Sequence, residues 1–155
     1  GMLFGAGTEY LLNENVGLQS EILFSQKGSK STEKDPVYFI LRINYLEIPL
    51  LLNYHTSNGI LLQAGISFDY LITAKFDDGA GFADQKESLK SFDYCYNIGF
   101  GYDVNENINL NIRFTYSILP INITAVNNLP VKNSGLFKIP GLFNNTLSFT
   151  FRYLL

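Results

Sequence analysis

Several residue types that usually carry chemistry are scarce or missing in this chain of 155 residues. There is no tryptophan, one methionine, one cysteine (Cys95) and one histidine (His55). A lone cysteine excludes an intrachain disulfide, and it predicts no cysteine-based metal site, so we expect Cys95 to be a buried spectator. As a catalytic base, His55 would need a nucleophile, and the sequence has no Gly-x-Ser-x-Gly element or similar motif. The sequence therefore predicts no enzyme, no cofactor and no metal site.

Charge is also scarce, and long apolar runs are missing. Charged residues make up 16% of the chain, against the usual value of about 25%, and the net charge is −3. Without a basic excess, nucleic-acid binding has no electrostatic support. No apolar run approaches the roughly 18 residues of a membrane helix, and no signal peptide is recognisable.

Aromatic residues are abundant, and apolar and polar residues alternate along most of the chain. Aromatics make up 15% of it, with 13 Phe and 10 Tyr. This period of two predicts β-strands, and no segment has convincing helical periodicity. The expected strands are residues 2–12, 16–26, 37–55, 60–76, 91–103, 108–124 and 142–155.

The two faces of these strands differ in bulk as well as in polarity. Phe, Tyr, Ile and Leu fill one face, whereas Gly, Ser, Thr, Asn and charged residues fill the other. A small barrel has room inside only for modest side chains, and a soluble monomer cannot expose so large an apolar surface. The pattern therefore favours lipid outside and a polar, ion-paired interior. The expected interior network comprises Glu9, Glu21, Glu47, Asp69, Asp93, Lys75, Arg113 and Arg152.

That network has two interpretations. It either lines a proton, ion or ligand site, or it is a set of salt bridges that fills the lumen. The second is favoured, because a small barrel leaves no open channel and charges of mixed sign favour pairing. Glu47 is expected to turn inward toward Arg113 or Arg152.

The connections alternate between short and long. Residues 13–15, 56–59 and 104–107 form short turns, whereas 27–36, 77–90 and 125–140 form loops. Outer-membrane barrels have short periplasmic turns and long outer loops. The chain is therefore expected to be one domain, 1–155, forming an antiparallel up-and-down transmembrane β-barrel. About seven strands of an expected eight are present, and the parity predicts that one more strand precedes residue 2.

Three local features carry further expectations. In segment 37–55, Arg42 and Asn44 fall on the face that is otherwise apolar, so the strand either projects beyond the lipid or contains a bulge near residues 43–45. The acidic loop residues could bind a divalent cation but lack EF-hand spacing, so a solvated loop is expected; they are Asp77, Asp78, Asp84 and Glu87. Tyrosines near the strand ends are expected to anchor the barrel at the two membrane interfaces; they are Tyr10, Tyr54, Tyr70, Tyr102 and Tyr116.

Four stretches resemble the small outer-membrane β-barrel family that is often labelled "porin family" or PorT-like. They are EILFSQKG (21–28), YLEIP (45–49), AGISFDYL (64–71) and DYCYNIGFG (93–101). The resemblance implies an additional N-terminal strand, and it implies little about activity, since some relatives are linked to secretion or surface attachment. The end of the chain, with Phe149, Phe151 and Tyr153 at alternate positions, is similar to the signal read by the barrel-assembly machinery, although it ends on Leu155.

The expected function is structural or interaction-mediating, in a bacterial outer membrane. The expected partners are lipid, the assembly machinery and an unidentified protein or surface that binds the long loops, with no nucleic acid. A narrow pore or small-solute transporter is the second hypothesis. A soluble, calycin-like ligand-binding barrel, with the apolar face turned inward, is the third.

Overall fold

The computed structural model describes residues 1–31, 38–122, 133–134 and 139–153, and these are almost wholly β-strand. The main strands are β1 (Leu3–Leu11), β2 (Val16–Lys30), β3 (Ile40–His55), β4 (Ile60–Asp77), β6 (Phe92–Asn105), β7 (Ile108–Ser117) and β10 (Asn145–Tyr153). The short elements are β5 (Ala83–Asp84), the 3-10 helix η1 (Lys86–Ser88), β8 (Asn133–Ser134) and β9 (Ile139–Pro140). In the described ranges, no helix has the length and hydropathy needed to span a membrane.

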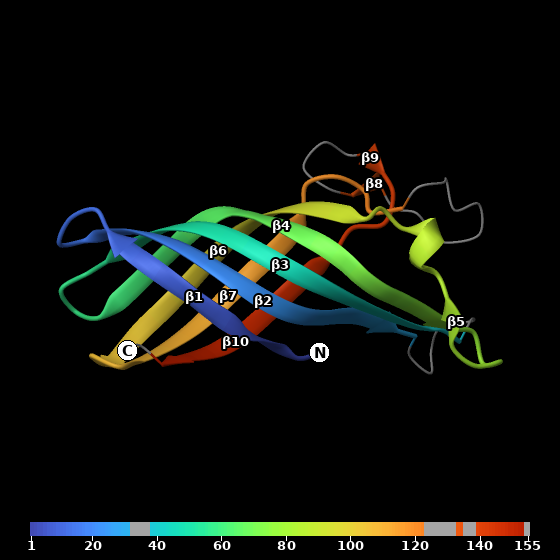
Figure 1. Cartoon of the computed structure of the whole chain (residues 1–155), viewed down its shortest axis with the longest axis horizontal. Helices are drawn as coiled ribbons and strands as arrows, with labels where there is room; N and C mark the ends of the chain where they lie inside the picture. The colour runs from blue at the N-terminus through green and yellow to red at the C-terminus, as the bar shows by residue number, and fades with distance from the viewer. Residues whose placement is uncertain (32–37, 123–132, 135–138, 154–155) are drawn as a thin grey trace.

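The main strands form one curled antiparallel sheet in the order β1-β2-β3-β4-β6-β7-β10, with β5 added beside β4 (Figure 1). Each main strand pairs with the next one along the chain, so the topology is up-and-down. This confirms the all-β antiparallel fold that the alternating pattern predicted. The edges of the sheet are β1 and β10, which do not pair with each other in the described part of the chain.

Short turns lie at one end of the sheet, on the left in Figure 1, and the longer connections leave from the other end. We call these the turn end and the loop end. In the first turn the side-chain oxygen of Asn13 accepts hydrogen bonds from the backbone N–H of Asn15 (2.9 Å) and Val16 (2.8 Å). In the second, Gly59 adopts φ 79°, a conformation that glycine reaches without strain. The C-terminal strand runs toward the turn end, and the first strand starts away from it.

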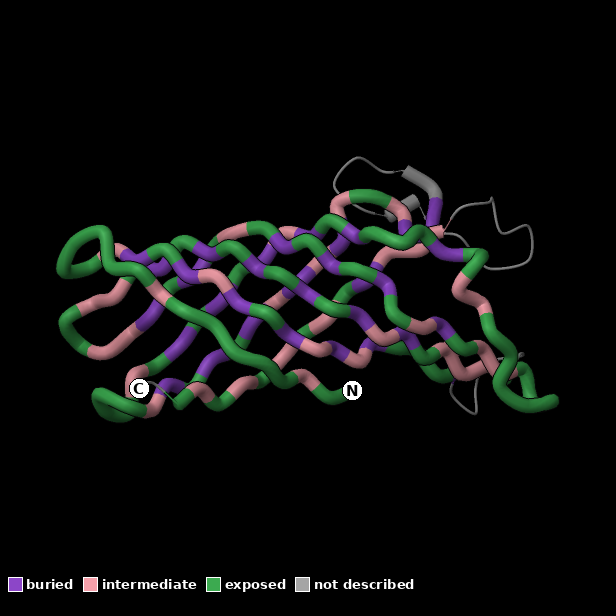
Figure 2. The backbone as a smooth tube through the Cα atoms, viewed as in Figure 1, coloured by how far each residue is buried: buried purple, intermediate pink, exposed green. Residues whose placement is uncertain are grey.

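The two faces of the sheet have opposite character. Figure 2 shows buried and exposed residues alternating along the central strands. The exposed set is apolar on strand after strand, as in Leu46, Ile48, Leu50 and Leu52 on β3, while the buried set is largely polar. A soluble barrel with its apolar face inside, the third hypothesis, is therefore wrong for this chain.

The pairing of β3 with β4 contains a register shift near residues 43–45, where the sequence pattern predicted either a bulge or a projecting strand. A second shift lies in the pairing of β6 with β7, between Asp103 and Asn105. Alternation along β3 is unbroken, with Ile43 and Tyr45 buried and Arg42 exposed. The pairing of β3 with β4 shifts between Asn44 and Tyr45, where the partner residue changes from Thr73 to Leu71. The extra residue of the bulge is thus Ile72 on β4.

Because of this bulge, one residue that was predicted to face the interior faces outward. An extra residue in a strand reverses the facing of everything beyond it. After Ile72, Ala74 is buried and Lys75 is exposed, opposite Arg42. The expectation that Lys75 belongs to the interior network is therefore wrong.

The interior becomes apolar at the loop end. Ile43, Tyr45, Leu71 and Ala74 from β3 and β4 pack with Leu89 and Ile121 from the two loops that follow β4 and β7. Backbone hydrogen bonds hold these loops together, from Lys90 N–H to the Ile121 carbonyl (2.6 Å) and from Ile121 N–H to the Leu142 carbonyl (2.8 Å). The apolar packing of β3 and β4 thereby extends to Leu89 and Ile121 in the segments that follow β4 and β7.

Candidate functional site in the barrel interior

The polar interior divides into two groups of side chains along the barrel. We name them by the end that they approach. The turn-side cluster comprises Glu9, Gln19, Glu21, Asn53, His55, Gln63, Asp103, Asn109, Asn111, Arg113 and Arg152. The loop-side cluster comprises Lys27, Glu47, Asp69, Asp93, Cys95, Ser117 and Asn144.

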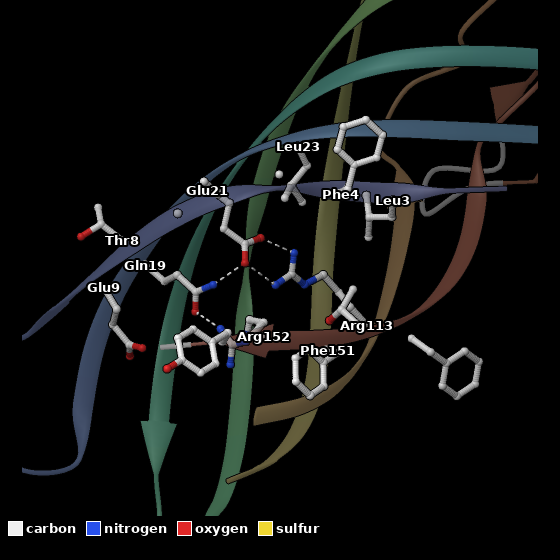
Figure 3. Close-up of a pocket in the computed structure, with 16 residues that line it drawn as sticks. Leu3, Phe4, Thr8, Glu9, Gln19, Glu21, Leu23, Arg113, Phe151 and Arg152 are labelled. Carbon is white, nitrogen blue, oxygen red and sulfur yellow. Dashed lines mark hydrogen bonds and ion pairs between the residues drawn. The ribbon is translucent and has the colours of Figure 1, made fainter. Parts of the chain in front are cut away.

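An ion pair between Arg113 and Glu21 crosses the lumen. Arg113 on β7 donates from Nη1 to Glu21 Oε2 (2.6 Å) and from Nη2 to Glu21 Oε1 (3.3 Å). Both residues are buried, and β2 and β7 are not neighbours in the sheet. Gln19 also donates to the Glu21 carboxylate, as Figure 3 shows. A bidentate pair of this kind holds both side chains in a defined geometry across the interior.

Arg152 brings a second guanidinium into the turn-side cluster from β10. Its Nη1 donates to Gln19 Oε1 (2.7 Å), and its Nε and Nη2 donate to Asn109 Oδ1 (3.0 and 2.7 Å). Its bonded partners are thus amide oxygens rather than carboxylates. Because Gln19 bonds both Arg152 and Glu21, the two arginines are linked through one network.

A belt of amide side chains fills the space beside these arginines. Gln63 donates to Gln19 Oε1 (3.0 Å) and Asn53 Oδ1 (2.8 Å), and it accepts from Asn111 Nδ2 (2.6 Å). These four residues come from four strands, β2, β3, β4 and β7. The belt joins strands that the backbone pairing alone does not connect.

His55 closes the turn-side cluster at its end. Its Nε2 lies 2.8 Å from Glu9 Oε1, and its Nδ1 lies 3.6 Å from Asp103 Oδ2. Asn53 also donates to Glu9 Oε1 (2.7 Å). His55 is therefore a member of the interior network, set between two carboxylates, and it is not simply a residue beside a turn.

The loop-side cluster is centred on Lys27. Its Nζ lies 2.7 Å from Glu47 Oε1 and 2.9 Å from Asp69 Oδ2, and all three side chains are buried. The expectation that Glu47 turns toward Arg113 or Arg152 is therefore wrong. The sequence pattern placed Lys27 in a loop, but β2 continues to Lys30 and directs Lys27 inward. The cue was the alternation itself, since Lys27 continues the inward parity of Glu21, Leu23 and Ser25.

Asp93 lies beside this lysine group and has neutral partners. Ser117 Oγ and Asn144 Nδ2 each donate to Asp93 Oδ2 at 2.7 Å. Asn144 Nδ2 also reaches the Tyr45 hydroxyl (3.2 Å), which connects the cluster to the apolar packing at the loop end. Cys95 is fully buried, and its Sγ lies 3.5 Å from Asp69 Oδ2.

The structure thus brings most of the predicted network inside but changes its pairing. Glu9, Glu21, Asp69, Asp93, Arg113 and Arg152 join Glu47 in the lumen, and Lys75 does not. Sequence reasoning missed Lys27 and the amide belt. A period-2 pattern identifies the face of a residue, whereas partners that are 42 or 92 residues apart are set by strand order and register.

The seam between β1 and β10 holds a half-open cavity of about 520 Å³. Backbone and side chains of residues 3–9 line one side, residues 149–153 line the other, and Glu21 and Arg113 form its floor (Figure 3). Strand β1 is exposed along most of its length on both faces, unlike the central strands (Figure 2). The network therefore reaches the outside laterally through this seam.

The predicted interfacial tyrosines occupy both ends of the apolar band. Tyr10, Tyr54 and Tyr102 are exposed at the turn end of their strands. Tyr70 lies at the other end, where its ring centroid is 5.3 Å from that of Phe92. Tyr116 stacks on Phe143, with 5.9 Å between the ring centroids.

In the acidic loop, carboxylate oxygens accept backbone hydrogen bonds. Asp77 Oδ1 accepts from the N–H of Gly79 (2.8 Å) and of Gly81 (3.0 Å), and Asp84 Oδ1 accepts from Lys86 N–H (2.8 Å). These carboxylates shape local turns.

Comparison with known proteins agrees with this architecture. A family model described as "Outer membrane protein beta-barrel domain" matches residues 1–122. The chain belongs to this family. No curated protein and no solved structure matches it.

Proposed function

We propose that this domain is a bacterial outer-membrane barrel with a structural or interaction role, a plugged interior and a partner surface at its loop end, and that it is not an enzyme. The observation that carries the proposal is the occupied lumen. Arg113 and Glu21 meet across it, and Arg152 joins them through Gln19. An apolar cluster that includes Leu89 and Ile121 packs into the loop end.

The partner surface is assigned to the loop end because strands extend there beyond the apolar band. Strand β4 has 18 residues, whereas about 9–11 tilted residues cross a bilayer. Past the last outward-facing apolar residues, Arg42 and Lys75 are exposed, and the Arg42 guanidinium lies 4.4 Å from the Phe82 ring centroid. Exposed basic groups on the extended strands, with an aromatic ring from the segment after β4, support recognition of a partner outside the membrane.

Two further partners follow from the lipid-facing strands. The exposed apolar band supports contact with lipid. On β10, Leu147, Phe149, Phe151 and Tyr153 alternate outward and are all more than half exposed. This arrangement supports recognition of the strand by the barrel-assembly machinery.

Recording ionic current across planar bilayers tests the plugged barrel. The full protein is expected to give no steady single-channel current. Replacing both Glu21 and Arg113 with Ala removes the crossing pair without leaving a lone buried charge, so this variant is expected to conduct. Lys75→Ala, outside the lumen, is the matched control and should behave as the parent. A steady current through the unmodified protein would favour the second candidate, a narrow pore, which the 520 Å³ seam cavity beside Arg113 supports.

A further inference from the structure

A cluster of two carboxylates and a thiol lies inside the barrel, apart from the crossing ion pair. Asp69 on β4 and Asp93 on β6 are directly opposite in the strand register, and Cys95 lies two residues beyond Asp93 on the same face. One ligand atom from each of the three lies within 4.8 Å of the others. Like charges directly opposite each other destabilise a sheet, so this arrangement needs a compensating interaction.

The three side chains are deeply buried and incompletely bonded. Asp69 and Cys95 are 0% exposed and Asp93 is 2% exposed. Lys27 and the Cys95 thiol donate to Asp69 Oδ2, and Ser117 and Asn144 donate to Asp93 Oδ2. Among the described residues, the Oδ1 atoms of both aspartates have no hydrogen-bond partner. Buried carboxylate oxygens are normally satisfied, and leaving them unbonded is costly.

The surrounding charges do not balance. The loop-side cluster holds three carboxylates, those of Glu47, Asp69 and Asp93, and one ammonium, that of Lys27. The remaining bonded groups, among them Ser117 and Asn144, are neutral. Elsewhere in the lumen, Arg113 is paired with Glu21, and that pair is neutral as a unit. Two negative charges are therefore left in a buried space, which requires a cation or bound protons.

We propose that Asp69, Asp93 and Cys95 form a binding site for a divalent transition metal ion of the Zn²⁺ type. A thiolate with two carboxylate oxygens suits a borderline-soft cation, whereas Ca²⁺ and Mg²⁺ take oxygen ligands alone. A proton shared between the two aspartates would join two oxygens and would leave Cys95 with only its contact to Asp69 Oδ2 (3.5 Å). The metal instead uses all three groups, and because it displaces the proton of the Cys95 thiol, the net charge of the cluster changes from two negative charges to one.

The test begins with the folded, full protein in detergent after treatment with a chelator. Zn²⁺ is expected to bind at one ion per chain, measured by elemental mass spectrometry after gel filtration, and to raise the unfolding temperature. Co²⁺ is expected to give a near-ultraviolet sulfur-to-metal absorption band, which requires no variant. Folded protein that binds no Zn²⁺, or that binds Co²⁺ without this band, would overturn the proposal and leave a shared proton as the compensation.

Variants separate this site from surface binding. Cys95→Ser and Asp93→Asn are each expected to weaken Zn²⁺ binding at least tenfold, and Cys95→Ser to abolish the cobalt–sulfur band. Asp78→Asn, in the exposed acidic loop, is the matched control and should retain both. Equal Zn²⁺ binding by Cys95→Ser and the parent would place the ion elsewhere and refute the assignment.

Discussion

Inside this barrel, a charged side chain is stable where a partner reaches it from another strand. Lys27 meets Glu47 and Asp69 from two different strands, and Arg113 meets Glu21 across the lumen. Lys75 has the same charge as Lys27, but it projects to the exposed face, so it does not need a partner of opposite charge from another strand. The burial of a charge, rather than its presence in a strand, therefore decides how much stability depends on it.

Replacing Lys27 with Met is expected to lower the free energy of unfolding by about 3–5 kcal/mol, because Glu47 and Asp69 lose their shared buried cation. Lys75→Met, its exposed counterpart, is expected to change stability by at most about 0.5 kcal/mol. Urea unfolding of the detergent-solubilised protein measures both variants. Equal effects of the two substitutions would contradict the interior placement of Lys27.

At the scale of elements, the bulge at Ile72 decides which side chains of β4 face the interior. Before it, Asp69 and Leu71 point inward; after it, Ala74 does, and the positive charge of Lys75 remains outside. If Ile72 paired regularly with β3 and formed no bulge, Lys75 would enter an apolar cluster formed by Ile43, Leu71 and their neighbours. A register shift of one residue therefore decides whether Lys75 is exposed or is buried as an unpaired charge at the loop end.

Deleting Ile72 is accordingly expected to preserve the facing of the strand, because Thr73 then follows Leu71 in regular alternation, with Ala74 still inward and Lys75 still outward. Deleting both Ile72 and Thr73 instead turns Lys75 inward, so this variant is expected to be strongly destabilised, and Lys75→Ala should recover much of the loss. Resistance of the folded form to SDS, followed on gels, measures folding. Equal folding of the two deletion variants would contradict this assignment of the register.

For the whole molecule, the outward face of β3 marks the depth of the lipid band. Leu46, Ile48, Leu50, Leu52 and Tyr54 face outward in succession, so Leu50 lies at the middle and Tyr54 near the turn end. The cost of a charge on the lipid face depends on depth. Leu50→Arg should therefore cost about 2–4 kcal/mol, whereas Tyr54→Arg should cost about 0–1 kcal/mol. Unfolding from lipid vesicles measures both, and equal costs would contradict this depth assignment.

The open seam bears on the strand count. Alternate backbone groups of β1 and β10 face the seam, and hydrocarbon cannot satisfy them. The predicted eighth strand between these two edges stays a prediction. If that strand closes the seam in the membrane-inserted full protein, the seam-facing amides of Leu3–Leu11 and Asn145–Tyr153 should exchange hydrogen slowly. Fast exchange at those amides would rule out a closing strand.

The sequence by itself determined the approximate strand positions, the antiparallel up-and-down order, the position of the short turns and which face is polar. These follow from local chemistry, because a period of two and turn residues such as Asn13 and Gly59 act within a few positions. The tertiary structure decided the pairings: Lys27 with Glu47, Arg152 with Gln19 and Asn109, and the meeting of Asp69, Asp93 and Cys95. It also decided that Lys75 faces outward, through a one-residue bulge on β4 that the alternation did not reveal. Alternation identifies the face on which a side chain lies, but its partner depends on register and on the curl of the sheet, which bring together residues far apart in the chain.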